Sequence, residues 1–113
     1  MANLRFKQIE ALQKGYRVTP MQKQINSGLC WHLEGSQGRF AADLLEAGIC
    51  MLPKHVCKDY YGNTIPSRDN LKPGTKGTFK NSQNFWQKVY DGDYEAINYL
   101  VSVFGADTEE EIM

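Results

Sequence analysis

The sequence GSQGRFAADLLEAG, residues 35–48, is the strongest helix signal in the chain. Its apolar residues recur on one face of a helix with 3.6 residues per turn, namely Phe40, Ala41, Leu44 and Leu45. Its charged residues fall on the opposite face, namely Arg39, Asp43 and Glu46. We expect Ser36 to cap the first turn and Gly48 to end the helix. The stretch therefore predicts an amphipathic helix that turns one face to a core.

Two shorter helices are expected before this stretch. Apolar residues recur at spacings of three and four over residues 6–16, and Gly15 is a stop signal. Thr19 is expected to cap the second helix, in which Pro20 fills the first position because its missing N–H needs no partner there. Gly28 is expected to end this helix.

Two more helices are expected toward the end of the chain. We expect Ser82 to cap the first, whose apolar arc consists of Phe85, Trp86, Val89 and Tyr90. Asp93 is expected to cap the second, which ends at Gly105 and whose stripe consists of Ile97, Leu100, Val101 and Phe104.

The segment between these groups, residues 49–79, contains three prolines and three glycines and shows no helical period. A short buried strand is expected at Ile49–Leu52, and a short extended piece at Leu29–Leu33. Gly62-Asn63 is expected to turn a small hairpin between Tyr60-Tyr61 and Thr64-Ile65.

The fold class that follows is mainly α, with α+β as the alternative. We expect a single globular domain over residues 1–105, built from about five short helices with a long Pro/Gly-rich loop and a minor hairpin. Its composition, 42% hydrophobic and 23% charged over 113 residues, is that of a globular protein and excludes disordered and collagen-like classes.

Neither a membrane span nor a secretion signal is expected. The longest apolar run, Ile49–Leu52, is far shorter than the bilayer requires, and the first residues lack the basic-then-apolar order of a signal peptide. Three cysteines cannot form a closed disulfide framework in one chain. We therefore expect a cytoplasmic protein without a membrane partner.

The charge of the chain is divided along its length, although the formal net charge is 0. Residues 1–90 carry all 13 Lys and Arg but only six acids, and residues 91–113 carry the other seven acids. Residues 106–113 are expected to form a flexible acidic tail. Such a division either solvates the two ends or marks electrostatic partners.

All cysteines and histidines lie within residues 30–57, at Cys30, His32, Cys50, His55 and Cys57. The commoner arrangement is cysteines in the core and histidines at the surface, so we expect no metal and no cofactor. The alternative is a zinc site in which two extended i,i+2 pairs supply Cys30, His32, His55 and Cys57. A Cys–His nucleophile has no supporting motif, so no catalytic residue is predicted and the protein is not expected to be an enzyme.

The loop over residues 54–80 is basic and contains interleaved aromatic residues. Together with one arginine near the start of the central helix, it supplies the predicted partner-binding residues: Arg39, Lys58, Tyr60, Tyr61, Arg68, Lys72, Lys76 and Lys80. Tyrosines and arginines are enriched in protein interfaces, and cations with aromatics also bind nucleic acid. The start of the central helix, GSQGR, is an ordinary cap or a phosphate site.

Several motifs in the middle of the chain carry a family resemblance. They are SGLCW at 27–31, EGSQGR at 34–39, GICML at 48–52, DYYGNTIPSR at 59–68 and KPGTKG at 72–77. The region from residue 19 to residue 80 resembles small proteins of unassigned role encoded in tailed-bacteriophage genomes. The resemblance implies a protein made in the cytoplasm of an infected bacterium, and it brings no catalytic residues with it.

The function expected from these observations is that of a phage-encoded, non-enzymatic interaction protein. Its partner would be a host protein, which it inhibits or redirects. The alternative is a small nucleic-acid-binding module that uses the basic aromatic loop, with or without a zinc ion. A steep dependence of binding on salt would distinguish the alternative from the first function.

Overall fold

The computed structural model describes residues 3–33 and 35–105. Within these residues five α-helices surround one core, which confirms the mainly α fold. They are α1 (Phe6–Gly15), α2 (Thr19–Ser27), α3 (Gly35–Ala47), α4 (Phe79–Tyr90) and α5 (Tyr94–Leu100). Shorter elements join them: the 3₁₀ turns η1 (Leu29–Trp31) and η2 (Arg68–Asn70), the π turn η3 (Val101–Gly105), and the strands β1 (Cys57–Lys58) and β2 (Thr64–Ile65). The predicted acidic tail, residues 106–113, lies outside the described residues.

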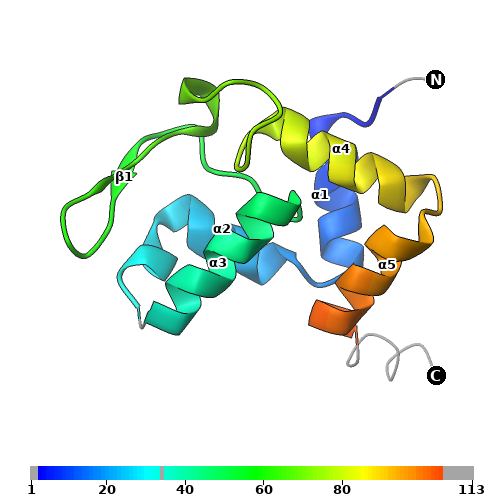
Figure 1. Ribbon diagram of the computed structural model, residues 1–113, viewed down its shortest axis with the longest axis horizontal. Coiled ribbons are helices and arrows are strands. Elements are labelled where there is room, and N and C mark those ends of the chain that lie inside the picture. Colours follow the sequence, from blue (N-terminus) through cyan, green and yellow to red (C-terminus); the bar gives the residue numbers. More distant parts are fainter. Residues whose placement is uncertain (1–2, 34, 106–113) are drawn as a thin grey trace.

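The helices form the body of the molecule, and the strands form a hairpin that projects from it. In Figure 1, α1, α4 and α5 lie on the right, α2 and α3 lie on the left, and the β1–β2 hairpin extends beyond α3 at the left-hand end. The described part of the chain measures 43 × 33 × 21 Å along its principal axes. Because the longest axis is horizontal in this view, the hairpin lies at one end of that axis. Within the described residues, no helix has the length and apolar character that crossing a membrane requires.

Each α-helix contributes an apolar side chain to the core. The largest fully buried side chains of the five helices are Ile9, Ile25, Leu44, Trp86 and Leu100. The apolar face predicted for the central helix is confirmed, because Ala41, Leu44 and Leu45 are buried while Asp43 and Glu46 are exposed.

The segment Ile49–Leu52 runs through the core, so its predicted burial is confirmed, but it is not a strand. Side chains satisfy several of its backbone groups in place of a neighbouring strand. Gln13 donates from Nε2 to the carbonyl oxygen of Ile49 at 3.0 Å, and Trp86 donates from Nε1 to the same oxygen at 3.0 Å. Gln22 bonds both the N–H and the C=O of Met51, at 3.0 and 2.7 Å. These bonds meet the requirement that buried backbone polar groups be paired.

Three of the predicted caps are wrong. Thr19 is the first residue of α2, whose N-cap is Val18. Ser36 lies inside α3, which begins at Gly35. Ser82 lies inside α4, whose cap is Thr78. The hydroxyl of Thr78 accepts the N–H of Asn81, and the helix therefore begins one turn earlier than expected.

The predictions for Asp93, Gly28 and Gly48 are confirmed, whereas α5 ends at Leu100 and not at the predicted Gly105, because η3 follows it. The carboxylate of Asp93 accepts the N–H of Ala96 at 3.0 Å and caps α5. Gly28 and Gly48 follow α2 and α3 with φ of 79° and 92°. A Cβ on Gly48 would lie 2.7 Å from the carbonyl oxygen of Asn81, so this turn also needs glycine for the close approach of α4.

The predicted hairpin is present, but its first strand is displaced along the sequence. Strands β1 and β2 are antiparallel, and they pair Cys57 with Ile65 and Lys58 with Thr64. Tyr60 and Tyr61 therefore lie in the turn rather than in a strand. The expected extended piece Leu29–Leu33 is also wrong, because its first three residues form η1.

Candidate functional site

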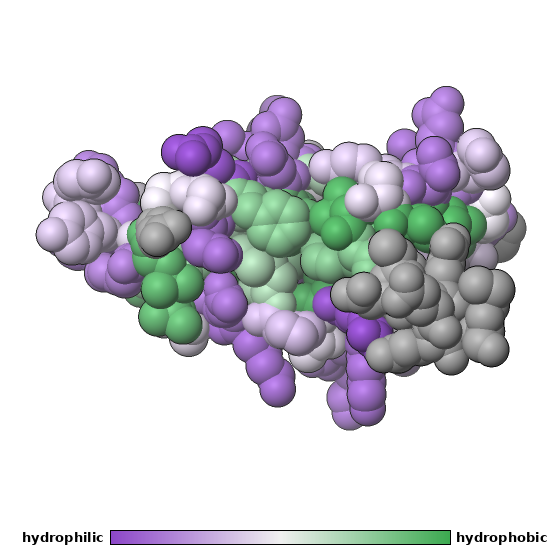
Figure 2. Space-filling model, turned by 90° about the horizontal axis from the view of Figure 1, so that it is seen from below, coloured by the Kyte–Doolittle hydropathy of each residue, from purple (hydrophilic) through white to green (hydrophobic). Residues whose placement is uncertain are grey.

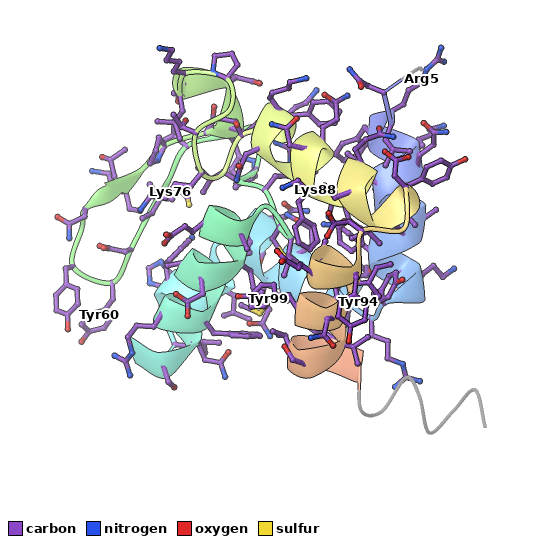
Figure 3. All side chains as sticks on the ribbon, turned by 45° about the vertical axis from the view of Figure 1, so that its right-hand side comes forward. Arg5, Tyr60, Lys76, Lys88, Tyr94 and Tyr99 are labelled. Carbon is purple, nitrogen blue, oxygen red and sulfur yellow. The ribbon has the colours of Figure 1, made fainter. Side chains whose placement is uncertain are left out.

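Two adjacent tyrosines at the end of the hairpin are among the most exposed large hydrophobic side chains of the described residues. Tyr60 is 73% exposed and Tyr61 is 84% exposed. Their ring centroids lie 5.3 Å apart, and the ring planes are almost perpendicular at 85°. Figure 3 shows Tyr60 at the far end of the hairpin, directed away from the helices. Residues 57–65 are called the tyrosine hairpin below.

The turn of the tyrosine hairpin is organised by one carboxylate. Oδ1 of Asp59 accepts the backbone N–H of Tyr61 at 2.9 Å and that of Asn63 at 2.8 Å. Oδ2 accepts a third bond from the Asn63 side chain at 3.2 Å. Desolvation raises the pKa of Asp59, but the bonds from Asn63 and Tyr61, together with the nearby His32, outweigh it and hold the pKa below its ordinary value. The aspartate therefore stays ionised and keeps the turn closed at neutral pH.

Two further bonds attach the tyrosine hairpin to the helical body. Nε2 of His32 donates to the carbonyl oxygen of Lys58 at 2.9 Å. The N–H of Tyr60 donates to the carbonyl oxygen of Trp31 at 3.1 Å. The hairpin is thus fixed both within its turn and against η1, which places the two tyrosines in a defined position.

A pocket lies between the tyrosines and the start of α3. Its volume is about 360 Å³, and it is lined by Cys30, Trp31, His32, Leu33, Gly35, Gly38, Asp59, Tyr60 and Tyr61. Leu29, Leu33 and Val56 are also exposed hydrophobics in this part of the chain. The periodicity of the sequence did not indicate Leu33 or Val56, because they lie outside regular helices. Of the three exposed hydrophobics, Leu33 lines the pocket, where it lies with the polar residues His32 and Asp59 as well as the tyrosines.

A second pocket, called the apolar pocket below, lies between α3 and the loop that follows the hairpin. It has a volume of about 260 Å³ and is lined by Trp31, Ala42, Leu45, Leu52, Ile65, Pro66, Leu71 and Lys76. Lys76 is the one charged residue among these. Trp31 lines both pockets, so the two adjoin through its side chain.

Four of the predicted contact residues are lysines that remain exposed. They are Lys58, Lys72, Lys76 and Lys80. Lys80 bonds the Gln83 side chain at 3.3 Å, and the other three form no ion pair within the described part of the chain. Figure 3 shows Tyr60 and Lys76 on the hairpin side of the molecule, while Lys88 and Tyr94 lie on the side of α4 and α5. Lys58 belongs to β1 of the hairpin.

Arg68 does not belong to this exposed set, contrary to the prediction. It is only 9% exposed, and its Nε donates to the carbonyl oxygen of Leu52. Its guanidinium also lies over the ring of Phe6 at 5.4 Å. Burial lowers the pKa of Arg68, and Asp69 and Glu10 oppose that shift. The side chain of Arg68 therefore holds the loop onto the core. The sequence around Arg68 did not reveal this role, because its partners Leu52 and Phe6 are distant in sequence.

Arg39 is exposed on α3, and its side chain turns back toward the first turn of the helix. A Cβ on Gly35 would lie 3.2 Å from its Nη1. This places a cation beside the helix start that the sequence marked as a cap or a phosphate site.

The cysteines and histidines are not gathered into a metal site. Among residues 3–33 and 35–105, no group of three or more His, Cys, Asp or Glu is placed to hold a metal ion. His32 is engaged with Lys58, and His55 is exposed. Burial, with a contribution from Cys57, raises the pKa of Cys30 to about 11, and burial raises that of Cys50 to about 12. Both thiols are therefore protonated at neutral pH, which makes them weak nucleophiles and weak ligands.

Apolar and aromatic side chains are also exposed away from the hairpin. Seen from below, hydrophobic side chains gather along the middle of the molecule with hydrophilic ones around them (Figure 2). On this side α3 meets η3, where the rings of Phe40 and Phe104 lie 6.1 Å apart. Tyr90, Tyr94 and Tyr99 are exposed on α4 and α5.

Comparison of the chain with family models, with curated proteins and with solved structures gives no significant match.

Proposed function

We propose that this chain is a phage-encoded, non-catalytic protein that binds a host protein through the tyrosine hairpin and thereby inhibits or redirects it. The observation that carries the proposal is the exposure of Tyr60 and Tyr61 on a turn that is already fixed. Large aromatic side chains anchor protein interfaces because they bury much area and lose little conformational freedom. A turn that is rigid before binding reduces the entropy lost on association.

The charge around the hairpin favours an acidic partner surface. Lys58 lies in the hairpin itself, and Lys72 and Lys76 lie in the loop that packs behind it. Asp59 is the acid nearest the tyrosines in sequence, and its oxygens are occupied by the turn. The unpaired lysines are thus available to steer an acidic face toward the tyrosines.

The phage assignment rests on the resemblance of the middle of the chain to small phage proteins. Three of the motifs that carry it meet at the two pockets. EGSQGR supplies Gly35 and Gly38, DYYGNTIPSR supplies the hairpin turn together with Ile65 and Pro66, and KPGTKG supplies Lys76. Their convergence on one end of the molecule supports a shared role in binding rather than three unrelated roles.

The second candidate is binding of single-stranded nucleic acid, which the lysines and the exposed tyrosines also support. The perpendicular rings of Tyr60 and Tyr61 favour the protein partner, because two stacked bases need faces that are presented side by side. The apolar pocket also suits the side chains of a protein better than the phosphates of a nucleic acid.

The test is affinity capture from a bacterial lysate with the wild-type protein, the double variant Tyr60→Ala/Tyr61→Ala and the control Tyr94→Ala. Tyr94 is 79% exposed, so its replacement removes an exposed tyrosine of similar accessibility at a different site. We expect one host protein to be retained by the wild type and the control and lost by the double variant. Equal capture by all three would reject the hairpin as the contact. Retention of nucleic acid instead, with a steep loss as salt rises, would favour the second candidate.

A further inference from the structure

We propose that the apolar pocket receives one large apolar side chain of the partner, placed next to a carboxylate that pairs with Lys76. The inference rests on the proposed function in that the partner is taken to be a protein. The occupant is therefore a partner segment in which a leucine or an aromatic residue is flanked by acidic residues.

The walls of the apolar pocket are held in place before anything binds. The N–H of Leu52 donates to the carbonyl oxygen of Gly77 at 2.8 Å, and the N–H of Gly77 donates to that of Leu45 at 3.3 Å. A Cβ on Gly77 would lie 2.6 Å from Cδ1 of Leu52, so the loop is pressed against the wall as closely as a glycine allows. Such a preformed pocket does not have to be ordered by its occupant.

The size and lining of the pocket select a side chain rather than a free small molecule. Pockets that enclose whole small ligands measure roughly 300–1,000 Å³, and this one measures about 260 Å³. Its walls are apolar side chains from α3, Leu52, the end of β2 and Leu71. A pocket of this kind accepts an interface anchor, because burying an apolar side chain in it removes that side chain from water.

The charge at the pocket selects what flanks the anchor. The ammonium of Lys76 is the one charge in the lining, and it has no ion-pair partner within the described part of the chain. A carboxylate beside the anchor would neutralise it, whereas a lysine or arginine there would be repelled. Because Trp31 separates this pocket from the one under Tyr60 and Tyr61, a single partner can contact both.

The experiment uses three labelled synthetic peptides and needs no partner protein. The peptide Asp-Glu-Leu-Phe-Glu carries an anchor and acids, Lys-Lys-Leu-Phe-Lys reverses the charge, and Asp-Glu-Ser-Ser-Glu removes the anchor. Binding is measured by fluorescence anisotropy, and the site is located by amide chemical shifts around the pocket. Ala42→Trp fills the pocket from an exposed helix position, and Ala11→Trp is its matched control on α1. Lys76→Glu reverses the charge, and Lys88→Glu is its matched control on α4.

We expect the first peptide alone to bind the wild-type protein, with shifts at Leu45, Leu71 and Lys76. Ala42→Trp should weaken binding about tenfold or more, and Lys76→Glu should weaken it several-fold and favour the lysine peptide. Both controls should bind as the wild type does.

No binding by the first peptide, binding that Ala42→Trp leaves unchanged, or a preference of the wild type for the lysine peptide would overturn the proposal. Should the peptide bind only after deletion of residues 106–113, the pocket would belong to the chain's own acidic segment instead of a partner. Because Lys76→Glu alters an exposed residue, it keeps the test valid if Ala42→Trp does not fold. Peptide binding is independent of the hairpin capture experiment, so either proposal can fail alone.

Discussion

The carboxylate of Asp59 accepts the backbone N–H of Asn63 at 2.8 Å and thereby closes the turn that carries the two exposed tyrosines. The same carboxylate also accepts the N–H of Tyr61 in the middle of the turn, so one side chain holds both the middle and the far end of the turn. The position of the candidate contact surface thus depends on a residue that is not itself expected to touch the partner.

Replacement of Asp59 by alanine should loosen the turn without unfolding the protein. The variant loses three hydrogen bonds to the turn, while the bond of His32 to Lys58 remains. We expect ¹⁵N relaxation to show greater motion at residues 60–63 and partner binding to weaken several-fold, with a melting temperature close to that of the wild type. Asp43→Ala, an exposed acid on α3, is the control. An equally rigid turn in the Asp59 variant would contradict the assignment.

The turn should also respond to acid, and the direction follows from the pKa of Asp59. The folded turn lowers this pKa below its ordinary value of 3.8, so the turn favours the ionised form. The contribution of Asp59 is therefore complete above the unfolded-state pKa and is lost as the pH falls through the lower folded-state pKa. We expect the amide shifts of Tyr61 and Asn63 to stay constant from about pH 7 to about pH 5 and to move only below 3.8. A midpoint above 3.8 would show that the bonds do not stabilise the carboxylate.

The helices were predictable because their signals are local, whereas the segment through the core was not. The apolar spacing around Leu44 and the position of Gly48 lie within one helix, so neighbouring residues are enough to identify them. Ile49–Leu52 is apolar enough to be recognised as buried, but its partners Gln13 and Gln22 are distant in sequence. Polar residues on the face of a predicted helix gave no sign that they would pair with a buried backbone.

The site was partly predictable for the same reason. Tyr60, Tyr61 and the lysines stand out by composition, and the structure leaves them exposed. Arg68 has the same composition signal, but the carbonyl oxygen of Leu52 and the ring of Phe6 bury it. The first strand of the hairpin ends earlier in the sequence than predicted, because the side chain of Asp59 extends the turn. Its bonds to the backbone compete with strand pairing, and the Gly-Asn signal does not reveal this competition.

The amphipathic face of α3 gives a direct test of the core. Leu44 is 1% exposed, and its replacement by alanine should lower the free energy of unfolding by about 2–5 kcal/mol through lost burial and a cavity. Asp43→Ala, one position away on the exposed face, should change it by less than about 1 kcal/mol. Chemical denaturation of both variants checks the difference, and similar losses would place the core on the wrong face of the helix.

The three thiols should differ in reactivity toward alkylating reagents. Burial raises the pKa of Cys30 to about 11 and that of Cys50 to about 12, and both side chains are buried. Cys57 is half-buried, and burial raises its pKa as well. Because the thiolate is the reactive form, we expect iodoacetamide near neutral pH to modify Cys57 first and slowly, and the other two only in denaturant. Mass spectrometry of digested protein measures the order, and rapid modification of native Cys30 would contradict it.

Deletion of residues 106–113 tests whether the acidic end of the chain acts on the basic surface. These residues lie outside the described part of the chain. Their deletion removes four acids and no Lys or Arg, so the formal net charge changes from 0 to +4. Three glutamates followed by Ile112 and Met113 also have the acidic and apolar character proposed for the occupant of the apolar pocket. If this segment competes for the pocket, the truncated protein should bind the acidic apolar peptide more tightly at low salt. The gain should shrink near 0.5 M salt, because the Debye length there is about 4 Å, roughly half its value of about 8 Å at physiological salt. Equal affinities of the full and truncated chains at low salt would show that the acidic end does not compete and that its role lies elsewhere.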